Sequence, residues 1–168
     1  MSYSTVVVMG VSAVGKSTVA QALARRLGVP FAEADDFHSE ANIAKMSAGV
    51  PLTDADRKPW LEAIGAWLRE REAAGSGGVV TCSALKRAYR DVLREAAPGA
   101  FFLHLTGSRE LLQQRIAARR GHFMPPELLR SQLETLEPLG ADEFGTTLDV
   151  TAPPEELVEE ALARLSRL

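Results

Sequence analysis

Runs of apolar residues alternate with amphipathic stretches along the whole chain. Short runs rich in β-branched and aromatic residues predict five strands, at residues 3–9, 30–33, 79–82, 100–105 and 147–150. Between these runs the apolar residues recur every three or four positions, which predicts helices at residues 16–27, 39–48, 53–74, 87–97, 109–120, 126–136 and 154–168. Strands that alternate with helices favour a parallel sheet with helices on both faces. The pattern therefore predicts a three-layer α/β fold in a single domain, residues 1–168.

The composition narrows the class of protein. Apolar residues make up 46% of the chain and charged residues 24%, which is typical of a globular domain in water. The formal net charge of −3 offers no basic surface for nucleic acid, and no apolar stretch approaches the ~20 residues that cross a membrane. The N-terminus lacks the pattern of a signal peptide, and a single cysteine, Cys82, cannot form an internal disulfide. We therefore expect a cytoplasmic protein with neither nucleic acid nor a membrane as partner.

A glycine-rich loop lies between the first predicted strand and the first predicted helix. Its sequence follows the pattern G-x-x-x-x-G-K-[ST] of a P-loop. In this pattern backbone N–H groups and the helix N-terminus surround phosphate oxygens, the lysine reaches the β- and γ-phosphates, and the hydroxyl ligates Mg²⁺. Lys16 and Ser17 take those two roles here. We expect the whole loop to bind ATP: Gly10, Val11, Ser12, Ala13, Val14, Gly15, Lys16, Ser17 and Thr18.

A second polar cluster follows the second predicted strand. Glu33 and Asp35 are two positions apart, so an extended segment would place both carboxylates on the same side. One carboxylate could hold Mg²⁺, and the other could accept the proton of a hydroxyl on an acceptor substrate. His38 is close enough along the chain to join them. The alternative interpretation is a solvated acidic turn.

Cations follow in two further places. Arg57 and Lys58 lie near the start of a predicted helix, where the helix dipole favours acids, and this suggests an anionic ligand. A surface ion pair with a neighbouring aspartate is the alternative. Lys86 and Arg90 come on successive turns after the third predicted strand and form a second candidate anion site. That strand ends Thr-Cys-Ser, without the aspartate of a Walker B motif, and we expect Cys82 to be a buried residue and not a nucleophile.

The last cluster combines arginines with a segment bounded by glycine and proline. Arg115 and Arg119 lie four residues apart on one face of a predicted helix, and Gly121 and Pro125 interrupt the chain soon after. We expect residues 119–136 to form a mobile lid that delivers an arginine to the transferred phosphoryl group. The alternative is a solvated amphipathic helix.

Five further motifs accompany the P-loop, at residues 34–38, 51–61, 82–86, 120–123 and 132–137. They include the strings D-R-x-P-W and C-S-A-L-K, and with the P-loop they cover nearly the whole chain in order. In these motifs the chain resembles the gluconokinase family. The resemblance implies a P-loop kinase fold shared with shikimate and nucleoside monophosphate kinases, ATP- and Mg²⁺-dependent phosphorylation of D-gluconate at its 6-hydroxyl, and a homodimer. Two positions depart from the family pattern: Glu33 stands where many members have aspartate, and Ser39 replaces a common proline.

The resemblance also implies a role for each candidate residue. Asp35 would orient or deprotonate the 6-hydroxyl, and Lys16 and the lid residue Arg119 would complete the catalytic set. The sugar acid would contact Asp35, His38, Arg57, Lys86, Arg90 and His122. Besides the P-loop, the nucleotide would contact Arg115, Arg119, Thr151 and Pro153. The metal would contact Ser17 and Glu33.

Two other functions fit part of the pattern. A kinase for shikimate or another small acid would share the P-loop. Shikimate kinases carry a glycine triplet after the third strand, however, where this chain has Ser83-Ala84-Leu85-Lys86. A non-catalytic nucleotide-binding module would need neither the acidic pair nor the lid arginines.

Overall fold

The computed structural model describes residues 5–11, 13–50, 52–118 and 126–166, except for the side chains of residues 126–128. Within these ranges five strands form one parallel sheet in the order β2-β3-β1-β4-β5. The strands are β1 (Thr5–Met9), β2 (Phe31–Glu33), β3 (Gly78–Thr81), β4 (Phe101–Thr106) and β5 (Gly145–Asp149). Because the strands are parallel, the segments that follow their carboxyl ends meet at one edge of the sheet.

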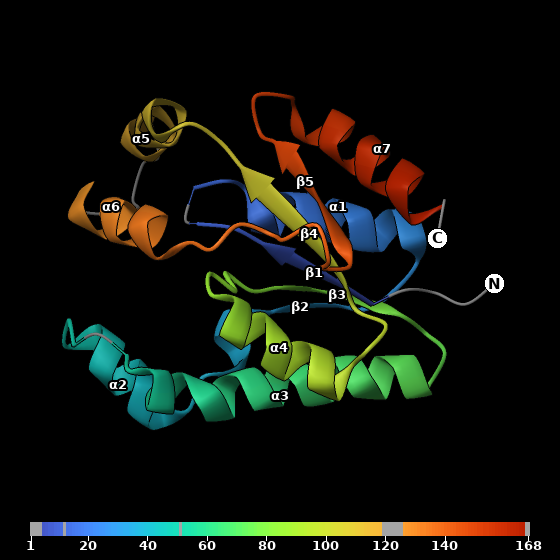
Figure 1. Ribbon diagram of the computed structural model, residues 1–168, viewed down its shortest axis with the longest axis horizontal. Helices are drawn as coiled ribbons and strands as arrows, with labels where there is room; N and C mark the ends of the chain where they lie inside the picture. Colours follow the sequence, from blue (N-terminus) through green and yellow to red (C-terminus); the bar gives the residue numbers. More distant parts are fainter. Residues whose placement is uncertain (1–4, 12, 51, 119–125, 167–168) are drawn as a thin grey trace.

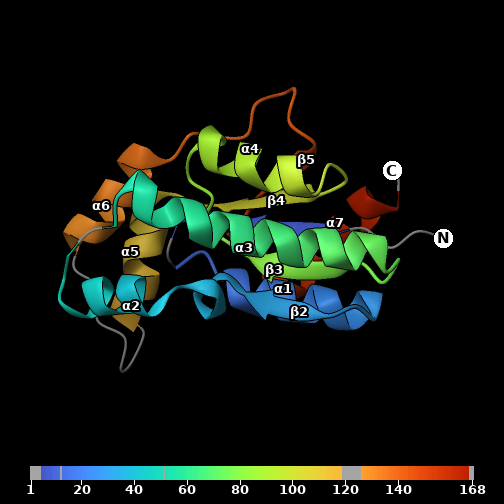
Figure 2. The ribbon, with the colours of Figure 1, turned by 90° about the horizontal axis from the view of Figure 1, so that it is seen from below.

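Helices cover both faces of this sheet (Figure 1). On one face lie α1 (Lys16–Leu27) and α7 (Pro154–Leu165), and on the other lie α3 (Asp54–Ala73) and α4 (Arg87–Ala96). The remaining helices are α2 (Glu40–Ser47), α5 (Arg109–Ala118) and α6 (Pro126–Thr135), and Figure 2 shows all three at one end of the molecule. This architecture confirms the predicted three-layer α/β fold. Among the described helices, none is both long and apolar enough to cross a membrane.

The sheet separates two apolar cores, because successive side chains of a strand point to opposite faces. Val6 of β1 packs in the core that contains Leu23 of α1, whereas Val7 packs in the core that contains Ile64 of α3. All four side chains are fully buried. Burial of a side chain of this size stabilises the fold by about 1.5–3 kcal/mol. Both faces of β1 are covered, as its unbroken apolar run predicted.

The predicted helix ends are marked by the residues expected to cap them. The hydroxyl of Ser39 accepts a hydrogen bond from the backbone N–H of Asn42 at 3.1 Å, which caps α2. Gly28 ends α1 in the left-handed conformation at φ 70°, where a side chain would be strained. Wherever the structure describes both, elements begin and end within about two residues of the predicted positions.

The segment after β2 is not extended, and this corrects one expectation. Residues 34–37 form a short 3₁₀ helix, so Glu33 ends the strand while Asp35 lies in the following turn. The turn is held by two contacts from other elements: Trp60 Nε1 donates to the Ala34 carbonyl at 2.7 Å, and the Ala34 N–H donates to the Thr81 hydroxyl at 3.3 Å. Spacing by two residues therefore does not put the two carboxylates on one side of a strand.

Helix α3 begins with a capping box and contains a proline. The Thr53 hydroxyl accepts from the Asp56 N–H at 3.1 Å, and the Asp56 carboxylate accepts from the Thr53 N–H at 2.9 Å. Pro59 has no N–H to donate to the carbonyl of Ala55, so α3 lacks the backbone hydrogen bond that would join these two residues. From Trp60 onward the helix packs against the sheet, and Trp60 itself is only 8% exposed.

Candidate active site

The P-loop connects β1 to α1 and takes a backbone path that favours glycine. Gly10 and Gly15 have φ values of 146° and 87°, and a Cβ on Gly10 would lie 2.5 Å from the carbonyl oxygen of Leu105. Gly15 is the N-cap of α1, and no side chain caps the first N–H groups of this helix. Uncapped N–H groups and the positive end of the helix dipole together suit a phosphate.

Lys16 lies across the loop that precedes it. Its ammonium group donates to the carbonyl oxygens of Gly10 and Val11, at 2.9 and 3.0 Å. Ser17 and Thr18 are exposed on the first turn of α1. The Ser17 hydroxyl and the carboxylate of Glu33 at the end of β2 offer oxygen atoms, which are the ligands that Mg²⁺ prefers. Ser12, also expected to touch the nucleotide, lies outside the described residues.

A pocket of about 320 Å³ opens beside the P-loop. Its walls come from the P-loop, α1, α5 and the start of α7, and include Ala13, Gly15, Thr18, Arg115, Ala152 and Pro154. Arg115 was expected at the nucleotide, and its guanidinium donates to the carbonyl of Val150 at the rim of this region. Thr151 is exposed and donates from its N–H and its hydroxyl to the Asp149 carboxylate. Pro153, also expected at the nucleotide, is exposed, and its two neighbours Ala152 and Pro154 line the pocket.

The two carboxylates after β2 have different environments. The Glu33 carboxylate accepts a hydrogen bond of 2.6 Å from the hydroxyl of Thr81 on the neighbouring strand β3. Asp35 is exposed on the 3₁₀ helix. Local sequence patterns could not predict that Thr81 binds Glu33, because the two residues are 48 positions apart. Glu33 is therefore partly engaged within the protein, while Asp35 is open to a ligand.

The thiol of Cys82, directly after β3, is buried. Cys82 is 1% exposed, and burial raises the pKa of its thiol to about 12, which confirms that it is no nucleophile at neutral pH. Lys16 lowers and Asp35 raises the pKa of this same thiol. The charges of Lys16 and Asp35 thus have opposite effects on the acidity of this thiol.

His38 is held at the border between the acidic turn and α3. Its ring stacks on Trp60 with 4.4 Å between ring centroids and 7° between planes. Its Nδ1 lies 3.4 Å from the Asn42 side-chain nitrogen. Burial lowers the pKa of His38; Asp35 raises it and Arg57 lowers it. The structure therefore brings together His38, Asp35 and Arg57, three of the residues predicted to contact the acceptor.

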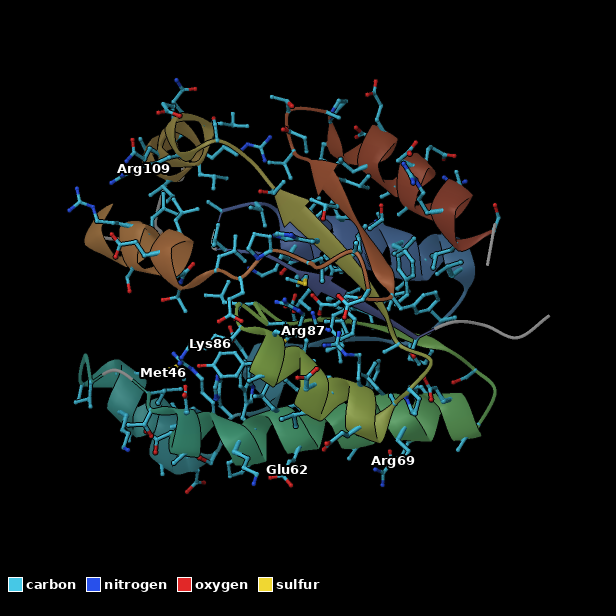
Figure 3. All side chains as sticks on the ribbon, viewed as in Figure 1. Met46, Glu62, Arg69, Lys86, Arg87 and Arg109 are labelled. Atoms are coloured by element: carbon cyan, nitrogen blue, oxygen red, sulfur yellow. The ribbon has the colours of Figure 1, made fainter. Side chains whose placement is uncertain are left out.

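The cations of the acceptor side gather around one tyrosine. Arg57 donates to the Tyr89 hydroxyl at 3.0 Å, and this hydroxyl donates to the Asp54 carboxylate at 2.6 Å. Lys86 lies 3.5 Å from the same carboxylate and 5.5 Å from the centre of the tyrosine ring. Figure 3 shows Lys86 at the start of α4, at the end of the molecule where α2 lies. Tyr89 and Asp54 were not predicted as site residues, although Tyr89 follows Lys86 by one helical turn.

These contacts also set the charge state of the cluster. The hydrogen bond from Tyr89 is the main cause that lowers the pKa of Asp54, with Lys86 and Arg57 acting in the same direction. Tyr89 and Asp54 raise the pKa of Lys86. Lys86 and Asp54 therefore remain ionised at neutral pH, and with the guanidinium of Arg57 beside them the cluster has a local excess of positive charge for an anionic ligand.

Arg90 is placed differently from the prediction. Its side chain is fully buried, and its guanidinium donates to both carboxylate oxygens of Glu143 at 2.7 and 3.0 Å. A third bond of 2.8 Å goes to the carbonyl of Ala84. With its donors used inside the protein, Arg90 has a structural role in this structure in place of the expected contact with the sugar acid.

The predicted lid is described only in part. Arg119 and His122 lie outside the described residues, and of the expected lid at residues 119–136 the structure describes α6 and the residue after it. Throughout the ranges that are described, no group of three or more histidine, cysteine, aspartate or glutamate side chains comes together as a metal site.

Comparison with known proteins places this site among kinases. A family model described as an AAA domain matches residues 6–139. The gluconokinase of Gluconobacter oxydans (strain 621H) is 51% identical over 156 residues, which cover 93% of this chain and 88% of that protein. The thermoresistant gluconokinase of Escherichia coli (strain K12) is 41% identical over 157 residues, covering 93% of this chain and 90% of that protein.

Solved structures agree with the sequence relatives. A gluconokinase from Sinorhizobium meliloti 1021 has a TM-score of 0.88 and 52% identity, covering 99% of this chain and 93% of that chain. An unliganded sugar kinase from Janibacter sp. HTCC2649 has a TM-score of 0.90 and 54% identity, covering 98% of this chain and 95% of that chain. Shikimate kinase from Aquifex aeolicus shares the fold. Its TM-score is 0.60 at 20% identity, and the match covers 96% of this chain and 95% of that chain.

Proposed function

Because the chain belongs to the gluconokinase family of P-loop kinases, we propose that it transfers the γ-phosphoryl group of ATP to the 6-hydroxyl of D-gluconate. The observation that carries this proposal is the meeting of three kinds of side chain at one edge of the sheet. A P-loop lysine follows β1, an acidic turn follows β2, and a cation cluster around Tyr89 follows β3. Gluconate is an anionic polyol, and it needs a carboxylate-binding cation beside groups that bind hydroxyls.

The nucleotide half of the site is the P-loop with the pocket beside it. Loop N–H groups and the start of α1 bind the phosphates, and Lys16 turns from the loop carbonyls to the β- and γ-phosphate oxygens. The adenine lies in the pocket between Arg115 and the start of α7, near Thr151 and Pro153. The Ser17 hydroxyl and the Glu33 carboxylate would hold Mg²⁺, which would supply positive charge to offset that of the phosphates.

The acceptor half draws its side chains from the acidic turn, the start of α3 and the start of α4. Asp35, exposed on the short turn that follows β2, orients the 6-hydroxyl and accepts its proton. Arg57 and Lys86 bind the carboxylate of gluconate, because both are held beside Tyr89 with their charge only partly offset by Asp54. His38 binds a hydroxyl of the chain. Arg119 and His122, in the lid, join the reacting complex on the basis of the family resemblance alone.

The setting of the enzyme is proposed on the same family basis. We place it in the cytoplasm as a homodimer, with ATP and gluconate as its small-molecule partners. Size-exclusion chromatography with light scattering at micromolar concentration tests the dimer, and a mass equal to that of one chain contradicts it.

A substrate panel tests the proposed function directly. ADP release is measured with D-gluconate, shikimate, related sugar acids and nucleoside monophosphates, each with Mg²⁺-ATP. We expect D-gluconate to give the highest kcat/KM, and Lys16→Ala, with an unchanged melting temperature, to lose roughly 10³-fold in turnover. Equal or greater turnover with shikimate would defeat the assignment. Binding of ATP without acceptor-dependent turnover would favour a nucleotide-binding module instead.

A further inference from the structure

The imidazole of His38 is fixed by contacts on its face and at its edge, and the backbone of residue 38 is held as well. The contact at the edge indicates which ring nitrogen carries hydrogen. Trp60 covers one face of the ring, and the backbone of residue 38 follows the 3₁₀ helix, with its N–H donating to the Asp35 carbonyl at 3.4 Å. At the ring edge, Nδ1 faces the side-chain nitrogen of Asn42 at 3.4 Å. Which of the two groups donates depends on how the Asn42 amide is oriented and on which ring nitrogen carries hydrogen.

The surroundings of Asn42 settle the orientation of its amide. Asn42 is 5% exposed, and its Nδ2 lies 3.0 Å from the backbone carbonyl of Asp56. A backbone carbonyl only accepts hydrogen bonds, so the NH₂ group and not the amide oxygen must face it. Asp56 cannot shift easily, because its carboxylate is bound by Lys45 at 2.9 Å to each oxygen and by the Thr53 N–H.

The second amide hydrogen then determines the state of the histidine. An NH₂ group carries two hydrogens and accepts none; one goes to Asp56, and the other points to His38 Nδ1. We propose that Asn42 holds His38 as the neutral tautomer protonated at Nε2, so that His38 meets the substrate as a hydrogen-bond donor and not as a proton acceptor. This inference deepens the proposed function and rests on it for the identity of the substrate.

The charges around the ring are compatible with a neutral imidazole. Asp35 on the 3₁₀ helix favours the imidazolium, while Arg57 on α3 opposes it, and burial of the ring lowers the pKa of His38 from its ordinary value. Protonation of Nδ1 would also place its hydrogen against the Asn42 amide hydrogens. As the pH falls, His38 therefore stays neutral to lower pH than a free histidine.

This tautomer gives His38 and Asp35 different roles in the acceptor half of the site. A nitrogen that already carries hydrogen cannot take the proton of the 6-hydroxyl, so this task falls to Asp35. The Nε2–H of His38 instead suits the oxygen of a substrate hydroxyl. Asn42 then acts as a positioning residue, since it contacts His38 and not the substrate.

Nitrogen NMR of the intact protein tests the tautomer without any substrate. Two-bond proton–nitrogen correlations distinguish protonated from unprotonated ring nitrogens, and the signals lost in His38→Gln identify residue 38 among the three histidines. At pH 7 we expect Nε2 protonated and Nδ1 unprotonated. A spectrum showing the Nδ1–H tautomer, a tautomer mixture or the imidazolium overturns the proposal. The result stands whether or not gluconate proves to be the substrate, so failure of the proposed function is recognised separately by the substrate panel.

Replacement of Asn42 by its acid should reverse the tautomer. In Asn42→Asp the carboxylate can only accept, so Nδ1 becomes the protonated nitrogen and the pKa of His38 rises. The KM for gluconate should then increase about tenfold at pH 8, where Nε2 lacks hydrogen, and recover near pH 6, where the imidazolium restores it. Gln113→Glu, an exposed change of the same chemistry on α5, controls for the added charge. A KM of Asn42→Asp that follows the parent at both pH values contradicts the proposal.

Two histidine variants separate donation from proton transfer. The Gln side chain can place an NH₂ where His38 has Nε2, whereas Asn reaches only the position of Nδ1. We expect the KM for gluconate to stay within about threefold in His38→Gln and to rise about tenfold or more in His38→Asn, with kcat little changed in both. Loss of kcat by a hundredfold in both variants, with KM unchanged, would make His38 an acid–base group and overturn the proposal.

Discussion

Helix α4 presents cations on two sides, and the partners on the two sides differ. Arg90 is fully buried and bound at 2.7 Å by Glu143, whose side chain is 1% exposed. Lys86, at the start of the same helix, lies 3.5 Å from Asp54, whose side chain is 68% exposed. One cation is saturated by a buried carboxylate, and the other retains most of its capacity to bind an anion.

This difference teaches how to separate structural from ligand-binding cations in one helix. Glu143 also accepts from Arg94 at 2.8 Å and from the Gly140 N–H at 2.8 Å, so this carboxylate helps to fasten the segment between α6 and β5 to α4. Around Lys86, by contrast, the carboxylate of Asp54 is mostly exposed, and the Tyr89 ring offers a face to both Lys86 and Arg57. A buried ion pair of the first kind makes removal of either partner costly, while the second kind leaves room for substrate.

Removal of the buried carboxylate should have the largest effect. Glu143→Ala leaves Arg90 charged, buried and unpaired, so we expect the free energy of unfolding to fall by about 3–5 kcal/mol in urea titrations. Asp142→Ala is the matched control, because Asp142 directly precedes Glu143 and also pairs with an arginine, Arg87. The side chain of Asp142 is 67% exposed. The control should cost much less. Equal losses in the two variants would refute the distinction between the buried and exposed pairs.

A fall in pH should have the second-largest effect, because it protonates the carboxylate of the buried pair. Burial raises the pKa of Glu143, but hydrogen bonds from Arg90, Gly140 and Arg94 outweigh it and leave the pKa at about 2, below the value of 4.5 for a free glutamate. Stability from this group is therefore full above pH 4.5 and is lost as the pH falls toward 2. We expect the gap in unfolding free energy between the parent and Glu143→Gln to narrow over that range. A gap that stays constant down to pH 2.5 would contradict the assignment.

The exposed side of α4 should respond in binding and not in stability. Lys86→Ala removes a cation proposed to bind the carboxylate of gluconate, so we expect the KM for gluconate to rise roughly 10- to 100-fold. The KM for ATP and the melting temperature should stay unchanged. Lys58→Ala, an exposed lysine beside Arg57, serves as control and should alter neither constant. A fall in melting temperature without a change in KM would make Lys86 structural.

The smallest effect is expected from the hydroxyl of Tyr89. Tyr89→Phe keeps the ring that both cations face but removes the hydrogen bonds to Asp54 and Arg57. We expect roughly a threefold rise in the KM for gluconate, with kcat and the KM for ATP preserved. A rise as large as that of Lys86→Ala would mean that the hydroxyl itself binds substrate.

Sequence reasoning succeeded where the determining contacts are local. The P-loop, the Ser39 cap and the Gly28 helix end each depend on residues within a few positions of one another. It failed for Arg90, because the carboxylate that binds it lies 53 positions away in the chain. Glu33 has the same kind of distant partner in Thr81. Local spacing indicates which residue types are present, but distant partners decide whether a charge remains available.

Pro59 gives α3 an uneven stiffness. The turn that carries Arg57 is fixed at one side by the capping box, and the helix from Trp60 onward is fixed by the core, with the missing hydrogen bond between them. A bend there breaks one backbone hydrogen bond fewer than a bend elsewhere in the helix. The turn that carries Arg57 can therefore tilt against the rest of α3 at a lower energetic cost than a later turn of this helix.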